Sequence, residues 1–468
     1  MAADTARQKW PHSYPYAEVL RVCLPLVVGM AATMVMEFTD RVFLANYSVA
    51  ALSAALPAGI AAFLCMAFLG GVAGYISVFI AQYNGAGRNE RIGAALWQGI
   101  YFTLLAGLIL VGIALFGSRP LFALAAHAPE VRVLEEIYFS ILCGGAILHV
   151  AAHTLSGFFT GRGMTRPVMV ANFLGMTVNI PLDYALINGV WGFPELGIVG
   201  AALATVFSWL VIVAILALVV FRRVNEQRFA VWSARAFDAE IFRRLLRYGI
   251  PGAMQFSIDI FAFSFFILMV GRIGTVELAA TNIVLSINSL AFMPALGFSY
   301  GISSLVGKAL GRQQPRQARR TTWSAVHLLC AFTLVVDLIF ILAPRTLIAL
   351  FVPTGGLQGE YAEIMPLAVH LLRVVAAYIL IDALYMIFAA VLKGAGDTRF
   401  IMWSVGLASL FVMLLPLTIG IEVLGWGVYA AWYCVLAYIA VLFGLSAWRY
   451  GQGSWQGMLV IERRQGVS

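Results

Sequence analysis

The sequence has few charged residues for its length. Only 11% of its 468 residues are Asp, Glu, Lys or Arg, whereas 62% are hydrophobic. An ordinary soluble domain has about 25% charged residues, so water is not the main solvent of this chain. Long apolar runs recur from end to end, and in hydrocarbon a run of about 20 such residues forms a helix. The composition predicts an all-α integral membrane protein.

Motifs of enzymes and ATP-driven pumps are also missing. The chain has no Gly-x-x-x-x-Gly-Lys-Ser/Thr phosphate loop, no His-Glu-x-x-His and no Gly-x-Ser-x-Gly. Its five cysteines lie inside apolar runs without Cys-x-x-Cys spacing, as small buried side chains do. We expect no enzyme activity, no cofactor and no transport driven by ATP hydrolysis in this chain.

What the sequence does contain is a regular series of apolar segments. We predict twelve transmembrane helices, near residues 18–46, 51–82, 92–118, 132–155, 165–188, 196–222, 241–271, 276–308, 320–343, 362–390, 400–421 and 424–448. The first segment spans more than twenty residues without a small-residue cleavage site, so we expect a membrane span and not a removed signal peptide.

The basic residues are distributed unevenly between the two sides of the membrane. With the N-terminus inside, twenty-four of the thirty Lys and Arg residues fall in cytoplasmic segments, including Arg7, Lys9, Arg463 and Arg464. The positive-inside rule then places both termini in the cytoplasm of a multi-pass protein of the inner, cytoplasmic membrane. The net charge of +8 therefore reflects membrane topology, and we expect contact with lipid and not with nucleic acid.

Two halves of the chain repeat each other. Leu20 to Pro25 matches Leu246 to Pro251, and about sixty residues later Gly87-Arg88 matches Gly311-Arg312. The basic stretch 222–247 separates six spans from six, so we predict an N-lobe at 1–235 and a C-lobe at 236–468. An even number of spans per half gives both halves the same orientation, with a pseudo-two-fold axis along the membrane normal. A closed bundle of this kind needs no partner, and we expect a monomer.

Ionisable residues inside the spans are the main functional signal, because burying a charge in a bilayer costs several kcal/mol. Glu37 and Arg41 stand four residues apart and are expected to neutralise one another largely. Asp40 has no such partner and is a candidate for ion coupling. The complete set is Glu37, Asp40, Arg41, Asp183, Asp259, Asp337, Arg373 and Asp382.

Polar residues accompany two of these acids. Asn179 and Asp183 share one helical face, and Tyr378 and Asp382 repeat that spacing. Asp259 could complete a second acidic site. Carboxylate and amide oxygens are ligands for hard cations, so Asp40 with Asp183, or Asp259 with Asp382, are candidate sites for sodium or for a proton.

Aromatic, sulfur-containing and polar side chains in spans 1, 7 and 8 could line a cavity for organic cations through dispersion and cation–π contacts. These weaker candidates are Met34, Glu37, Phe38, Met254, Gln255 and Phe292.

Taken together, these residues resemble the MATE (multidrug and toxic compound extrusion) family over essentially all twelve spans. The resemblance rests on the Leu-Pro and Phe38-Thr39-Asp40 of the first span, on Gly85 to Arg88, and on Gly161 to Pro167. Pro251 followed by Asp259, and 378–382 running into 392–398, resemble its NorM-type branch.

The resemblance implies a secondary-active antiporter that exports small organic cations or drugs in exchange for H+ or Na+ by alternating access. It implies an N-lobe ion site and a C-lobe ion site. The N-lobe residues would be Asp40, Asn179 and Asp183, with Tyr138 and Thr205. The C-lobe residues would be Asp259, Tyr378 and Asp382.

The chain departs from the NorM-type pattern at two of these positions. Asp259 stands where that branch usually has Glu. Asp183 stands where it often has Asn, and with Asp at this position the chain resembles the other prokaryotic branch. Coupling through one lobe or through both therefore stays open. The nearest alternative is a lipid-linked oligosaccharide flippase of the same broad superfamily, for which we would expect extra helices or a cationic cavity.

Overall fold

The structure is a computed structural model that describes residues 14–123, 127–350 and 358–462. Arg7, Lys9, Arg463 and Arg464, which contributed to the predicted orientation, lie outside the described residues. Within them the chain is helical, and twelve helices are long and apolar enough to cross a membrane. The predicted fold class is confirmed.

The spans begin and end within a few residues of the predicted positions. Three are built from consecutive helical pieces, namely α2 with α3, α4 with α5, and α15 with α16. The first half contains α1 (Tyr16–Tyr47), α2 (Val49–Gly74), α3 (Ile76–Gly85), α4 (Glu90–Gly112), α5 (Ser118–Ala123), α6 (Pro129–Gly161), α7 (Arg166–Asn188), α8 (Ile198–Val220) and α9 (Arg223–Phe229). The second half contains α10 (Ala239–Ile273), α11 (Thr275–Gly311), α12 (Pro315–Leu342), α13 (Pro344–Ala349), α14 (Gln358–Ala395), α15 (Thr398–Ala408), α16 (Leu415–Glu422) and α17 (Val428–Gly451).

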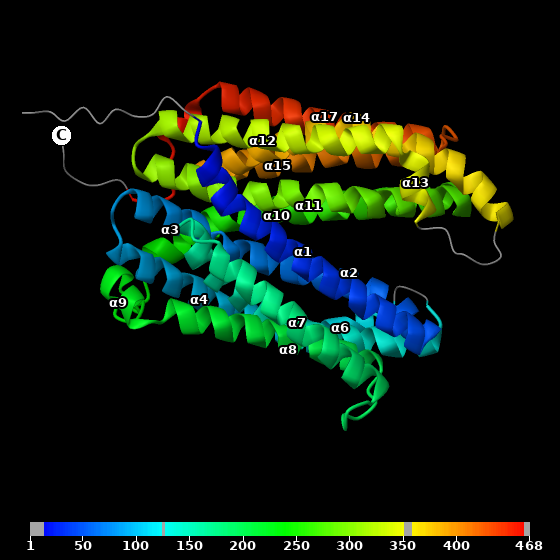
Figure 1. The fold of residues 1–468 in the computed structure, drawn as a ribbon, viewed down its shortest axis with the longest axis horizontal. Helices are drawn as coiled ribbons and strands as arrows, with labels where there is room; N and C mark the ends of the chain where they lie inside the picture. The colour runs from blue at the N-terminus through cyan, green and yellow to red at the C-terminus, as the bar shows by residue number, and fades with distance from the viewer. Residues whose placement is uncertain (1–13, 124–126, 351–357, 463–468) are drawn as a thin grey trace, which may run out of the picture.

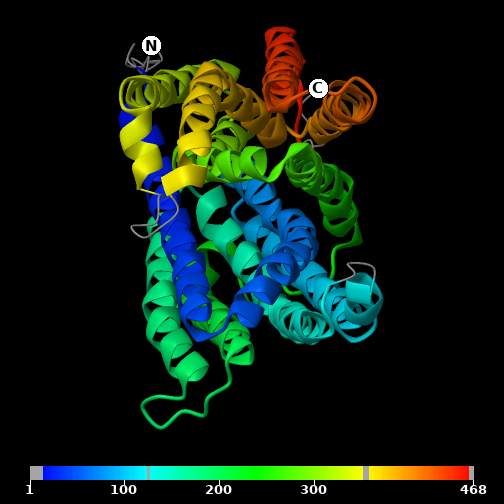
Figure 2. The same ribbon diagram turned by 90° about the vertical axis from the view of Figure 1, so that its right-hand side faces the viewer.

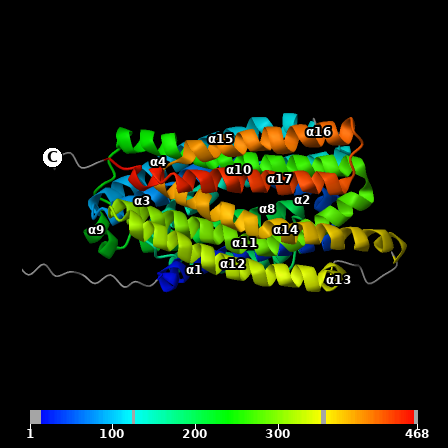
Figure 3. The ribbon, with the colours of Figure 1, turned by 90° about the horizontal axis from the view of Figure 1, so that it is seen from above.

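Figures 1 and 3 show the long helices running along the longest axis of the molecule. Large apolar side chains remain exposed on the outside, including Leu108 (73% exposed), Phe116 (80%) and Leu218 (72%). A soluble protein rarely leaves so much apolar surface in water. This outer surface suits the hydrocarbon of a bilayer.

The helices gather in two groups, which Figure 2 separates clearly. Each group has its own hydrophobic core, one formed mainly by α2 to α8 and the other mainly by α11 to α17. The repeat in the sequence thus corresponds to two packed bundles. A lobe boundary between residues 235 and 236 remains a prediction.

Side-chain packing does not follow that boundary at the first helix of each half. The beginning of α1, with Val22 and Cys23, packs into the second core, whereas Leu44 near its end packs into the first. The beginning of α10, with Leu245, packs into the first core, and its later residue Phe266 packs into the second. Figure 1 shows α1 crossing diagonally between the groups.

We call the end of the bundle that holds α9 and the C-terminal segment the basic end (Figure 1). Here α3 of the first half meets α11 of the second. A Cβ atom added to Gly311 would lie 2.9 Å from the carbonyl carbon of Gln82 and would overlap its oxygen. A Cβ atom on Gly85 would likewise overlap the carbonyl oxygen of Lys308. Only glycine permits this approach of the two backbones.

The C-terminal segment 454–462 ties the halves together at the basic end, and we call it the strap. Its Glu462 carboxylate accepts hydrogen bonds from Tyr83 (2.7 Å) and Arg88 (2.5 Å), and it pairs with Arg91 (3.2 Å). Burial would raise the pKa of Glu462, but the bond from Tyr83 and the two arginines hold it below its ordinary value of 4.5. The strap follows α17, so these contacts run from the second half to the first.

Hydrogen bonds between the halves reinforce the same end. The amide of Gln82 donates to the carbonyl of Gly394 (3.0 Å) and its oxygen accepts from the backbone of Val460 (2.8 Å). Tyr75 donates to the carbonyl of Lys393 (2.8 Å). The basic ends of the two halves are therefore held closed in this structure.

Candidate functional site

The first acidic cluster lies inside the first half, where α1, α7 and α8 meet. Asp40 is 6% exposed, and Asp183 is fully buried on α7. The two carboxyl groups are close enough to interact electrostatically. Thr205 of α8 donates a hydrogen bond to the Asp40 carboxylate (3.2 Å). We call this arrangement the N-half cluster.

Asn179 and Tyr138 complete the surroundings of the N-half cluster. Asn179 lies one turn before Asp183 on α7 and is fully buried. The Tyr138 hydroxyl, on α6, interacts electrostatically with both acids. The structure thus brings these acids and Tyr138 together, with Thr205 bound to Asp40 and Asn179 on the same helix as Asp183.

Several buried atoms of this cluster lack a protein partner. Both amide atoms of Asn179, both carboxylate oxygens of Asp183 and Oδ1 of Asp40 have no hydrogen-bond partner among the described residues. Leaving a buried polar group unpaired costs about 1–3 kcal/mol, and more for a charged one. Oxygen atoms of this kind are suited to hold a proton or a hard cation.

The second acidic cluster lies inside the second half and is centred on Asp259 of α10. Tyr438 of α17 donates to its Oδ1 atom (2.5 Å), and Gln255 donates to its Oδ2 atom from one turn earlier. The Asp382 carboxyl, on α14, interacts electrostatically with Asp259. We call this arrangement the C-half cluster.

Tyrosine hydroxyls surround the C-half cluster. The Tyr378 hydroxyl interacts electrostatically with Asp382, and it is buried with no hydrogen-bond partner among the described residues. The Gln255 amide also contacts the Tyr385 hydroxyl (3.4 Å). Tyr438 is bonded to Ser409 (3.1 Å), which begins the π-helical segment Ser409–Leu414. Single π-helical turns inside α-helices occur frequently at functional sites.

The sequence did not indicate Tyr438, Tyr385 or Lys393 as members of this cluster. Lys393 lies eleven residues after Asp382 on α14, and its ammonium group interacts electrostatically with Asp259. Gln255 was expected to line a substrate cavity, but its amide is bonded within the cluster. One signal was available, because Gln255 and Asp259 are four residues apart and share a helical face.

Comparison with known proteins agrees with this architecture. The family model described as MatE matches residues 25–185 and 251–418. The chain belongs to the MatE family. It is therefore a membrane transporter and not an enzyme, and the resemblance to the MATE family predicted from the sequence is confirmed.

Two curated MatE relatives cover most of the chain. One, named probable multidrug resistance protein NorM, comes from Bradyrhizobium diazoefficiens and is 30% identical over 82% of both chains. The other, named multidrug resistance protein NorM, comes from Burkholderia vietnamiensis. It is 28% identical over 92% of this chain and 93% of its own.

Solved structures show the same fold. An outward-facing multidrug resistance MATE family transporter of the MOP superfamily has a TM-score of 0.85 at 21% identity, over 95% of this chain and 96% of its own. A MOP superfamily transporter from Pyrococcus furiosus, for which a reversed polarity of the binding pocket has been described, also has a TM-score of 0.85. It is 20% identical over the same shares.

The residues expected to line a substrate cavity in this MatE protein differ in exposure. Phe38 is 68% exposed and Met254 is 36% exposed. Glu37 is also exposed, whereas Met34 and Phe292 are partly buried. Glu37 and Arg41 interact electrostatically, but the described residues show no salt bridge between them. A role for these residues in binding substrate stays a prediction.

Proposed function

We propose that this transporter exports small organic cations and drugs in exchange for H+ or Na+ by alternating access. One observation carries the proposal: inside the membrane-spanning bundle, the first half buries the interacting acids Asp40 and Asp183, and the second half holds the partly buried, interacting acids Asp259 and Asp382. Intramembrane acids are costly unless they serve a purpose such as an ion pathway. Two acids that lie close together are stabilised when they share a proton or a cation.

A bound ion can drive a conformational change only through its different affinity for the two states. Each acidic cluster is built from side chains of several helices. The N-half cluster, for example, is built from side chains of α1, α7 and α8. A rearrangement of the bundle that moves these helices relative to one another would change that affinity. The pairs Asp40 with Asp183 and Asp259 with Asp382 are the sites that we propose for H+ or Na+, which are substrates of the exchange.

The chemistry of the substrate follows from the same charges. An acidic interior attracts cations, and Met34, Phe38 and Phe292 offer apolar and aromatic contacts to a greasy one. Both curated relatives carry the name multidrug resistance protein NorM. This supports export of several organic compounds in place of a single metabolite.

We further propose that the protein lies in the inner, cytoplasmic membrane as a monomer with its basic end in the cytoplasm. The arginines gathered at that end support this orientation through the positive-inside rule. The two halves, taken as lobes at 1–235 and 236–468, would rock relative to one another. The basic-end contacts would then close one side of the pathway and separate when the other side closes.

The test is efflux of a fluorescent organic cation from proteoliposomes under an imposed proton gradient and, separately, under a sodium gradient. We expect one gradient to drive export. Failure of both gradients over a broad panel of organic cations, together with transfer of a labelled lipid-linked saccharide across the membrane, would favour a flippase instead.

Substitution separates coupling from folding. Asp40→Asn and Asp382→Asn should each lower gradient-driven export about tenfold or more, within the 5- to 150-fold range of a typical coupling free energy. Asp337→Asn is the matched control, since it neutralises an acid on α12 that belongs to neither cluster. Equal export by both cluster variants and by the control would refute the coupling roles.

A further inference from the structure

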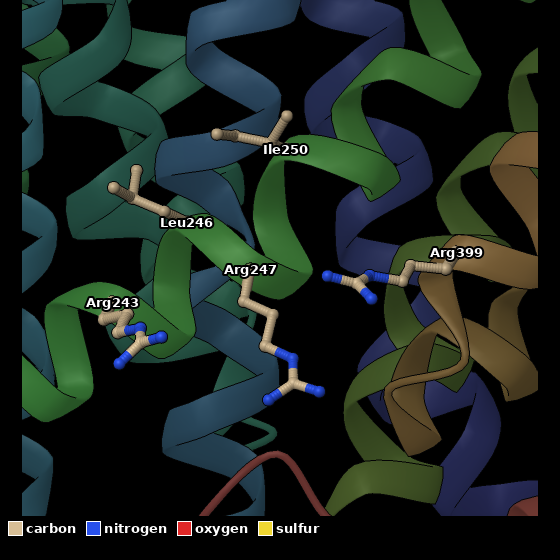
Figure 4. A pocket seen from close by; sticks show the side chains of 5 residues that line it. All are labelled: Arg243, Leu246, Arg247, Ile250 and Arg399. Atoms are coloured by element: carbon tan, nitrogen blue, oxygen red, sulfur yellow. The ribbon is translucent and has the colours of Figure 1, made fainter.

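A cavity of about 380 Å³ lies at the basic end between α10 and α15. Three of the five residues that line it are arginines, namely Arg243, Arg247 and Arg399, and the other two are Leu246 and Ile250. Figure 4 shows the guanidinium groups of Arg247 and Arg399 directed toward the same space between the two helices. The cavity therefore presents positive charge and apolar surface together.

The charge and the apolar surface are arranged in order along the helices. On α10, Arg243, Leu246, Arg247 and Ile250 follow the spacing i, i+3, i+4 and i+7, which places them on one face. The arginines come first, at the basic end, and Ile250 lies furthest toward the middle of the span. A ligand that fits this face carries a negative group at one end and an apolar body at the other.

The same order appears on α15. Trp403 and Leu407 follow Arg399 at intervals of four residues, and they are 63% and 50% exposed. Tryptophan is common at the level of lipid headgroups. The exposed faces of both helices thus run from arginine at the basic end to apolar side chains in the bilayer.

The acids of this region are already engaged elsewhere. Asp238 pairs with Arg91 (3.1 Å), Glu240 with Arg244 (2.5 Å) and Asp397 with Arg449 (2.7 Å). Glu462 of the strap pairs with Arg88. Among the described residues, no salt bridge involves any of the three cavity arginines. Their charge is available to a ligand.

We propose that this cavity binds the phosphate of an anionic glycerophospholipid such as phosphatidylglycerol, with its acyl chains along Ile250, Trp403 and Leu407. Basic pockets between transmembrane helices at the cytoplasmic side suit anionic headgroups. A free phosphate ion would use the arginines alone, and the apolar half of the face favours the lipid. The site is separate from both acidic clusters, so it does not depend on the coupling ion or on the exported compound.

The experiment is native mass spectrometry of the full-length protein in detergent, titrated with phosphatidylglycerol or with phosphatidylcholine of the same acyl chains. The variant replaces Arg243, Arg247 and Arg399 with Gln. Its matched control replaces Arg222, Arg223 and Arg316 with Gln. These three arginines are exposed at the same end, away from the cavity, so both variants lose three positive charges.

We expect the wild type and the control to bind phosphatidylglycerol more tightly than phosphatidylcholine. Each arginine near an anionic lipid is worth about fivefold in affinity, so the cavity variant should lose that preference by tenfold or more. Arg399→Gln alone should lose about fivefold, which keeps the test decisive if the triple variant fails to fold. Equal losses in the cavity variant and the control would show a general charge effect and would overturn the proposal.

A competition arm distinguishes the lipid from a free anion. Inorganic phosphate at the same concentration should leave bound phosphatidylglycerol in place, because it lacks acyl chains to contact Ile250 and Leu407. Displacement of the lipid by an equal concentration of phosphate would assign the cavity to a free anion and refute the lipid site.

Discussion

The contact of α3 with α11 allows a direct test of how the transporter changes conformation. The change is Gly311→Ala, which adds one methyl group where the two backbones meet. That Cβ atom would lie 2.9 Å from both the Cα and the carbonyl carbon of Gln82, whereas carbon atoms pack best about 3.5–4.0 Å apart. The carbonyl oxygen of Gln82 lies closer still, so the two helices must separate by about 1 Å or more.

The free-energy cost follows from this overlap. Inserting a methyl group into a packed contact typically costs about 1–3 kcal/mol. Gly311 joins the two halves only while their basic ends are closed, so the cost falls on that conformation and not on one in which the ends have separated. A difference of about 1–3 kcal/mol shifts such an equilibrium 5- to 150-fold. Gly85→Ala, at the facing backbone, should act in the same direction.

Distances between spin labels at Glu90 and Arg316, two exposed positions at the beginnings of the following helices α4 and α12, would report the shift. The label distances should lengthen in Gly311→Ala relative to the wild type. Gly144→Ala is the control, because it gains the same helix propensity and its Cβ atom meets nothing within 4 Å. Identical distance distributions in Gly311→Ala and Gly144→Ala would refute the reasoning.

Two further predictions concern single hydrogen-bonding groups. Tyr438→Phe removes a donor that stabilises the ion-free carboxylate of Asp259. A bond to a charged group contributes roughly 1.5–3 kcal/mol, so a proton should bind Asp259 more tightly and the proton concentration that half-saturates export should fall about tenfold or more. Tyr433 is exposed on the same helix, so Tyr433→Phe should leave the half-saturating concentration unchanged. Equal half-saturating concentrations in both variants would contradict the role of Tyr438. Glu462→Gln should speed amide hydrogen exchange in 458–462, while Glu240→Gln should not. The pKa of Glu462 is lowered in the folded state, so the ionised carboxylate stabilises the strap at neutral pH. This stabilisation is lost as the pH falls through the lowered pKa, below 4.5. A spin label in 458–462 whose mobility stayed constant down to pH 3 would argue against this role of Glu462.

Some properties of this protein were fixed by local sequence alone. Hydropathy located all twelve spans to within a few residues, because each apolar helix satisfies its own backbone hydrogen bonds and needs only its own residues to cross the bilayer. The acids at Asp40, Asp183, Asp259 and Asp382 were visible as functional candidates because a charge inside such a span is exceptional. The pairs Asn179 with Asp183 and Tyr378 with Asp382 followed from helical periodicity.

Only the tertiary structure decided which of these residues meet. Asp259 binds Tyr438, 179 residues later in the chain, and no pattern within one helix predicts a contact that depends on how α10 and α17 pack. The packing of whole helices likewise decides that α1 and α10 each contribute to both cores. It also decides that Glu462 of the strap pairs with Arg88. The physical reason is that spans are set by transfer of each segment into lipid, whereas sites are set by packing among segments far apart in sequence.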